Sequence, residues 1–183
     1  MEPRARLQLL TQMVGVLLLA DAASGKTFET REVALQRVFG RDAAVDRRTS
    51  FLTETQIDAA RAAAGASIEH ARITYYVATR DDSLLGRAYL DTHRVRSLYE
   101  TLLIVVEPDG RTRSVDVLAF HEPEDYLPPP RWLRQLEERQ LSKRLRPGDG
   151  VDAISGATLS ARAAAEAVRR VLALDRILHG EPQ

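Results

Sequence analysis

The stretch that most constrains the fold is an apolar run in the middle of the chain. Residues Thr101–Glu107 read Thr-Leu-Leu-Ile-Val-Val-Glu. Such a run puts apolar groups on both faces of a strand, and both faces must then be covered. Pro108-Asp109-Gly110 follows as a turn, because proline fixes φ and glycine accepts a positive φ. Arg113–Phe120 then alternates apolar and polar residues. We therefore predict a hairpin whose first strand is central in a sheet.

The sequence before this hairpin predicts two helices. Thr30–Phe39 has helical spacing of its apolar residues and is followed by a glycine. A second helix begins at Thr53, which forms a capping-box pattern with Gln56, and it ends at Gly65.

Two more strands and two more helices complete the pattern. Ile73–Thr79 and Leu85–Thr92 are rich in β-branched and aromatic residues and read as paired strands. Arg131–Gln140 reads as a helix entered through a proline. A last helix, from about residue 159 to 178, has an inner face of Ala164, Ala167, Val168 and Val171 and an outer face of Arg162, Glu166, Arg169 and Arg170. The expected fold class is α+β, an antiparallel sheet flanked by helices.

Composition excludes several functions. The chain has 183 residues and a formal net charge of +0, which fits one domain and gives no sign of nucleic-acid binding. It has no cysteine, so disulfides, thiolate metal sites and iron–sulfur ligation are excluded. The four histidines are widely spaced and do not predict a zinc site. Redox chemistry would therefore need an organic cofactor or the centre of a partner.

The N-terminus has the pattern of a secretory signal peptide. Arg4 and Arg6 precede a mostly apolar stretch over residues 7–20, and Ala20-Asp21-Ala22 has small residues where a signal peptidase cleaves. Two alternatives stay open, an amphipathic helix of a cytosolic domain and an uncleaved membrane anchor. We expect residues 1–22 to be a signal peptide or anchor, 23–69 a helical extension and 70–183 the functional domain.

The stretch between Asp152 and Ser160 carries the candidate chemistry. It is a tight turn that leads into the last helix, with hydroxyl groups on Ser155, Thr158 and Ser160. Gly156 lets the backbone approach a ligand closely, and a helix N-terminus presents unpaired N–H groups to an anion. From these residues alone, an anion site and an ordinary helix cap both remain possible.

This stretch resembles the flavinylation motif of the FMN-binding domain family, Asp-x-x-Ser/Thr-Gly-Ala-Ser/Thr. Asp152, Ser155, Gly156, Ala157 and Thr158 match every fixed position. The family includes the FMN-bearing subunits of the sodium-translocating NADH:quinone reductase and of the Rnf electron-transport complex, and stand-alone extracytoplasmic flavoproteins. The resemblance implies FMN attached through its phosphate to Thr158, the other four residues forming the recognition loop. It also implies that an FAD:protein FMN transferase installs the group from FAD, using Mg²⁺.

Outside the motif the resemblance is less specific. The hairpin and the loop that begins at Glu122 are similar to the family's strand, turn, strand and Glu-containing loop. That loop reads Glu-Thr-Pro-Gly-Leu-Gly in the quinone-reductase type and lacks those glycines here, so residue roles in it do not transfer. Further candidates for FMN contact are Leu159 and Ser160 beside the attachment site, Glu100 and Thr101 near the ribityl chain, and Glu122 and Tyr126 near the ring. Tyr99, Trp132 and His121 are candidate stacking groups. The alternative for Trp132 is a place in the core.

The expected function is that of an electron carrier outside the cytoplasm. The expected location is the periplasm, and association with the membrane stays open. Its redox partner would be a quinone-linked complex, a haem protein or an iron–sulfur protein. An electron-carrier module fits the sequence better than a self-sufficient oxidoreductase, because no catalytic triad, paired-carboxylate arrangement or P-loop is present. Two other functions stay open: reversible binding of FMN or another phosphate ligand, and a non-redox accessory protein on the same scaffold.

Overall fold

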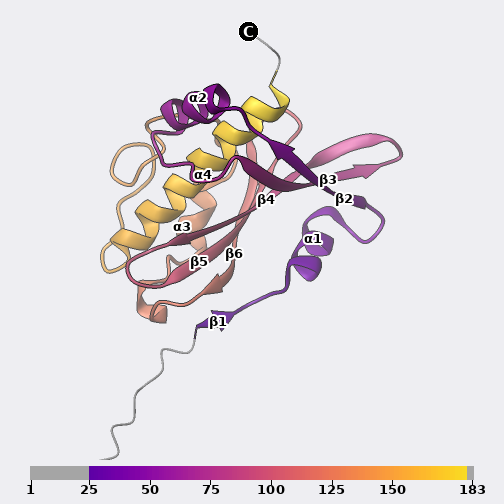
Figure 1. Cartoon of the computed structure of the whole chain (residues 1–183). Coiled ribbons are helices and arrows are strands. Elements are labelled where there is room, and N and C mark those ends of the chain that lie inside the picture. Colours follow the sequence, from indigo (N-terminus) through magenta and orange to yellow (C-terminus); the bar gives the residue numbers. More distant parts are fainter. Residues whose placement is uncertain (1–24, 181–183) are drawn as a thin grey trace, which may run out of the picture.

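The computed structural model describes residues 25–180, which form one six-stranded antiparallel sheet with helices on both faces (Figure 1). The strand order is β1-β6-β5-β4-β3-β2. The strands are β1 (Lys26–Thr27), β2 (Ala44–Phe51), β3 (Arg72–Arg80), β4 (Ser83–Arg94), β5 (Tyr99–Val106) and β6 (Thr112–Phe120). The helices are α1 (Arg31–Phe39), α2 (Glu54–Ala64), α3 (Pro130–Leu133) and α4 (Thr158–His179), with 3-10 turns at Glu124–Tyr126 and Arg134–Leu136. The α+β class is confirmed.

Strand β5 is central, as the apolar run predicted. Residues 102–106 are all fully buried. Leu102 and Ile104 pack with α4 on one face, and Leu103 and Val105 pack with α1 on the other. The predicted hairpin is present as β5 and β6, and Gly110 in its turn has a φ of 82°. The sheet therefore has two covered faces and two separate apolar clusters.

Helix α4 is the long element that covers one face of the sheet (Figure 1). Its predicted inner face is buried throughout, at Ala164, Ala167, Val168 and Val171. The predicted outer position of Arg169 is wrong, because this side chain is 4% exposed and donates hydrogen bonds to the carbonyls of Ala64 and Leu145. The reason is that α2 and the loop before the motif cover the side of α4 that amphipathic spacing alone assigns to solvent.

The two N-terminal helices are capped as the sequence predicts. The Thr30 hydroxyl accepts a bond from the N–H of Val33 at the start of α1. At α2, Thr53 and Gln56 form a reciprocal capping box, and Gly65 ends the helix in the left-handed conformation.

The segment 23–69 was expected to be a helical extension, and the structure adds strands to it. Strand β2 pairs with β3 along its whole length and forms one edge of the sheet, and the short β1 pairs with β6 at the other edge. Periodicity could not reveal β2, because six of its eight residues are exposed, none is buried, and the strand is held by backbone hydrogen bonds. The predicted helix over residues 131–140 is shorter, with one α-helical turn and one 3-10 turn.

A buried ion pair joins the sheet to the C-terminal half of α4. Arg87 on β4 donates to both carboxylate oxygens of Asp175, at 2.5 and 2.9 Å, and the Tyr89 hydroxyl donates to the same group at 2.8 Å. Burial and the Asp175 charge together raise the pKa of Tyr89, which keeps its hydroxyl protonated as a donor. This contact fixes the position of α4 on the sheet at the end away from Thr158.

The expected signal peptide or anchor, residues 1–22, lies outside the described residues. Within residues 25–180, no helix combines the length and the apolar character that a membrane crossing requires.

Candidate functional site

The motif residues form the turn into α4 and its first turn. Thr158 is the first residue of the helix, and Ala157, at the N-cap, provides no side-chain cap. The first-turn N–H groups of a helix have no intrahelical acceptor, so this end of α4 is free to bind an anion. The Thr158 side chain is exposed, and its hydroxyl donates to the carbonyl of Ile154 at 2.9 Å. The candidate attachment oxygen is therefore accessible, and its position is fixed by the turn.

The loop before α4 is anchored to α3 and the following 3-10 turn. The indole N–H of Trp132 donates to the carbonyl of Asp152 at 2.8 Å, and the N–H of Asp152 donates to the Gln135 side chain at 3.0 Å. Trp132 is 4% exposed and belongs to the main apolar cluster. It thus acts as a core residue that holds the start of the motif, which was the alternative to ring stacking.

Gly156 is the motif position whose backbone requires glycine. Its φ is +86°, a conformation that side chains with a Cβ rarely adopt, and no atom lies within 4 Å of where a Cβ would be. The glycine therefore serves the sharp turn and also leaves free space beside Thr158. Ser155 and the Asp152 side chain are exposed on the same turn.

A small pocket of about 100 Å³ lies at this helix end. Its lining residues are Arg96, Tyr126 and the run Gly156 to Ser160. Ser160 is 1% exposed, and its hydroxyl oxygen has no hydrogen-bond partner within residues 25–180. Because buried hydroxyls are nearly always bonded in proteins, this group indicates a polar ligand or an ordered water at the pocket.

Arg96 reaches the pocket from the turn between β4 and β5. The Glu122 carboxylate holds that turn by accepting bonds from the N–H groups of Arg96, Ser97 and Leu98, at 3.1, 2.7 and 2.8 Å. Burial raises the pKa of Glu122, but these three donors outweigh it and lower the pKa below its ordinary value. The Arg96 guanidinium lies over the Tyr126 ring, 5.0 Å from its centroid. Glu122, expected to contact the flavin ring, thus orders the turn that carries Arg96.

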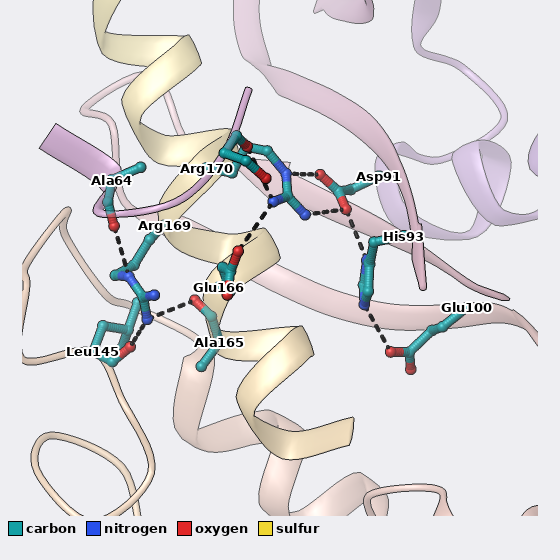
Figure 2. Close-up of polar contacts among 10 residues, drawn as sticks. Ala64, Asp91, His93, Glu100, Leu145, Ala165, Glu166, Arg169 and Arg170 are labelled. Carbon is teal, nitrogen blue, oxygen red and sulfur yellow. Dashed lines mark hydrogen bonds and ion pairs between the residues drawn. The ribbon is translucent and has the colours of Figure 1, made fainter. Parts of the chain in front are cut away.

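A second and much larger cavity, of about 750 Å³, lies beside α4. We call it the α4–β4 pocket. Its walls are α4, β4, the start of β3, and the loop between α2 and β3. Three of its lining residues belong to the polar chain in Figure 2, in which Arg170 of α4 pairs with Asp91 of β4 and Asp91 bonds His93. The chain continues behind the lining, where His93 bonds Glu100 of β5. Arg170 also lies 3.7 Å from Glu166 on its own helix.

Strong pKa shifts mark this polar chain. Burial alone would lower the pKa of His93, but its hydrogen bonds to Asp91 and Glu100 raise it to about 9. Burial alone would raise the pKa of Asp91, but Arg170 and His93 lower it to about 2. Burial raises the pKa of Glu100 against the opposing effect of His93. His93 is therefore a cation at neutral pH with both ring nitrogens engaged, which makes it a fixed charge and not a free base.

Of the remaining predicted residues, some line one of the two cavities and others line neither. Glu100 is fully buried, and one of its oxygens has no hydrogen-bond partner within residues 25–180. The Thr101 hydroxyl bonds that of Thr92 at 3.0 Å. Tyr99 lines the α4–β4 pocket, whereas Tyr126, Leu159 and Ser160 line the small pocket with Thr158. His121 lines neither cavity, and the role of all these residues toward FMN stays a prediction.

Sequence reasoning missed Arg96, Asp91, His93 and Arg170. A signal in the sequence was available for Asp91 and His93. They lie at alternate positions of β4, on the same face as the buried Tyr89, where an apolar residue would be expected. Arg96 had no local signal, since it comes close to Thr158 only through the fold. No His, Asp and Glu cluster within residues 25–180 has the arrangement of a metal site.

Fold and site together define an α+β domain in which a helix N-terminus without a side-chain cap lies beside a small pocket. Residues 99–173 match the model of the FMN-binding domain family. The match runs from β5 to the middle of α4 and includes the whole motif, and it supports FMN as the ligand. It is narrower than the expected domain of residues 70–183. No curated protein and no solved structure matches the chain.

Proposed function

We propose that the protein is an extracytoplasmic electron carrier that holds one FMN through a phosphoester on Thr158. The observation that carries the proposal is the exposed Thr158 hydroxyl at a helix N-terminus without a side-chain cap. The pocket beside it contains the Ser160 hydroxyl, which has no hydrogen-bond partner among the described residues. The family match supports FMN as the group that is bound.

The small pocket has the groups that a phosphate requires. Arg96 provides a guanidinium, whose planar set of donors suits phosphate oxygens. Ser160 provides a hydroxyl that bonds no other group in residues 25–180, and the first turn of α4 provides backbone N–H groups. The helix dipole adds roughly 0.3–1 kcal/mol for an anion at this position, and up to about 2 kcal/mol when the anion is partly buried. Thr158, Ser160 and Arg96 would therefore hold the phosphate end of FMN.

The attachment is a transfer reaction with FAD as donor. The Thr158 oxygen forms a bond to the FMN phosphorus, the pyrophosphate P–O bond of FAD breaks, and AMP leaves. The hydroxyl proton passes to a base of the FAD:protein FMN transferase. The bond from Thr158 to the Ile154 carbonyl is given up when the oxygen is esterified. The product exceeds the apoprotein by the mass of FMN less one water.

A covalent link suits a carrier outside the cytoplasm. Occupancy of a reversible site falls once the free ligand drops below its Kd, whereas an ester retains the group at any dilution. When bound, FMN supplies one- and two-electron transfer, and the protein contributes position and environment. A quinone-linked complex, a haem protein or an iron–sulfur protein would exchange the electrons.

The first test is intact-mass spectrometry of protein exported from cells that also make the transferase. The wild type should be yellow and carry the added mass of FMN less water. Thr158→Ala should lose all of that mass while keeping the circular dichroism of the wild type. Thr158→Ser is the matched control, because it keeps a hydroxyl at the same position and should still be modified. An unmodified, colourless wild type would refute the proposal.

The same samples separate the two alternative functions. If FMN binds reversibly, acid precipitation will release the colour into the supernatant, and Thr158→Ala will still bind FMN. If the protein is a non-redox accessory, neither form will show affinity for FMN. Retention of N-terminal residues in the exported protein will distinguish an uncleaved anchor from a cleaved signal peptide.

A further inference from the structure

We propose that the α4–β4 pocket receives the isoalloxazine ring of the FMN attached at Thr158. The inference rests on the proposed function and adds to it the location of the redox-active ring. It concerns a cavity that is formed largely by β3, β4 and the loop after α2, all of them outside the segment that matches the family.

Residues that are neighbours in sequence line the two cavities on both walls. On α4, Leu159 lines the small pocket and Ala163 lines the α4–β4 pocket, one helical turn further on. On the opposite wall, Arg96 lines the small pocket, and Arg94 and Tyr99, on either side of the same turn, line the larger one. A group held at the first turn of α4 therefore reaches the α4–β4 pocket by following one helix face.

The distance along α4 and the size of the cavity both suit a flavin ring. With a rise of 1.5 Å per residue, Ala163 lies about 7 Å along the helix axis from Thr158, and Glu166 lies about 12 Å away. An extended ribityl chain covers the shorter of these distances, which places the ring between the two residues. The cavity volume of about 750 Å³ is within the range of sites that enclose organic ligands of this size. The small pocket, at about 100 Å³, holds a phosphate but not a three-ring system.

The lining of the α4–β4 pocket also matches the chemistry of the ring. Ile73, Val171 and Leu174 provide an apolar part of the lining, and Arg170, Asp91 and His93 provide a polar part. The isoalloxazine ring has the same division, with a dimethylbenzene edge and an edge of carbonyl and N–H groups. Arg170 and Asp91 are fixed by two mutual hydrogen bonds, at 2.7 and 2.9 Å, and their side chains are only 15% and 10% exposed (Figure 2). The polar part is thus preorganised and needs no large movement to bind a ligand.

The experiment fills the pocket and follows the ring. Ala163→Trp places a large side chain on the α4 wall, and Arg162→Trp is the matched control, because Arg162 is exposed and does not line the cavity. Each variant is produced with the transferase, and intact mass first establishes that FMN is attached. Iodide quenching of flavin fluorescence and the visible circular dichroism of the flavin then report whether the ring is enclosed.

Wild type and Arg162→Trp should carry FMN that iodide reaches several-fold less well than free FMN, with a clear visible dichroism signal. Ala163→Trp should keep the added mass, lose most of that protection and lose the signal. Ser67→Trp, on the exposed loop opposite, gives the same readout if Ala163→Trp fails to fold.

Two results would overturn the inference, and they are distinguishable. If the pocket-filling variants carry FMN and leave protection and dichroism unchanged, the ring lies elsewhere while the proposed function stands. If the wild type carries no FMN mass, the proposed function fails, and the inference fails with it.

Discussion

At the scale of single residues, His93 is the side chain whose state depends most on its neighbours. It lies between the carboxylates of Asp91 and Glu100, at 2.8 and 3.1 Å, with its side chain 11% exposed. Two acids on one imidazole keep the ring charged, and Arg170 in turn neutralises Asp91. The polar lining of the α4–β4 pocket is therefore a set of fixed charges that stabilise one another.

This arrangement makes stability depend on pH. The pKa of His93 is raised from 6.5 to about 9 in the folded chain, so its contribution is complete below pH 6.5 and is lost as pH rises through 9. A shift of this size corresponds to roughly 3 kcal/mol. Urea unfolding at several pH values should show this decline in the wild type. His93→Gln, which cannot hold the charge, should be less stable at pH 6 and show little decline.

The contribution of Asp91 to stability depends on pH in the opposite direction. The pKa of Asp91 is lowered from 3.8 to about 2, so its contribution is present above pH 3.8 and is lost as pH falls toward 2. Stability from this pair of groups is therefore greatest between about pH 4 and pH 6.5. A decline that is equally steep in the wild type and in His93→Gln above pH 6.5 would show that the charge on His93 is not its cause.

At the scale of elements, the contact between α3 and the motif loop connects the fold to the site. Trp132→Phe keeps an aromatic ring in the core and removes the N–H that bonds the Asp152 carbonyl. A lost bond of this kind costs about 1 kcal/mol in stability. The turn should also hold Thr158 less firmly, so the fraction of protein that carries FMN after a fixed time should fall.

Two further variants test whether this contact acts by ordering the motif loop. Gln135→Glu keeps an oxygen that can accept from the N–H of Asp152, whereas Gln135→Ala removes it. Intact mass after a fixed modification time should separate the two, with Gln135→Glu close to wild type. Equal modification in all three variants would show that the transferase does not require the ordered turn.

Several helices and strands could be predicted from the sequence, and others could not. The β5–β6 hairpin, the caps of α1 and α2, and α4 follow from local patterns, and the structure contains all of them. Strand β2 could not be predicted, because its polar, exposed residues carry no alternation and its place depends on pairing with β3. The same limit applies to the site: the motif is local, whereas Arg96 and the α4–β4 pocket are assembled by strands and helices that are distant in sequence.

At the scale of the whole molecule, the buried contact of Arg87 with Asp175 determines how α4 sits on the sheet. Removing one partner of a buried pair leaves an uncompensated charge, which costs about 3–5 kcal/mol. We expect Asp175→Leu to lower the free energy of unfolding by this amount in urea titrations.

The double variant Arg87→Met with Asp175→Leu is the control, because it removes both charges and leaves apolar groups of similar size. It should recover most of the lost stability, since buried pairs are often replaceable by well-packed apolar residues. If the double variant is as unstable as Asp175→Leu, the lost stability comes from packing or from the Tyr89 hydrogen bond, and not from the unpaired charge.

The exposed position of Thr158 bears on whether folding comes before or after the proposed flavin attachment. Its oxygen is oriented by the carbonyl of Ile154, four residues earlier, and the two meet only when the turn is formed. An enzyme that recognises this geometry acts on chains that have already folded and passes over those that have not. Each molecule that carries the flavin would then be one that had folded before the flavin was attached.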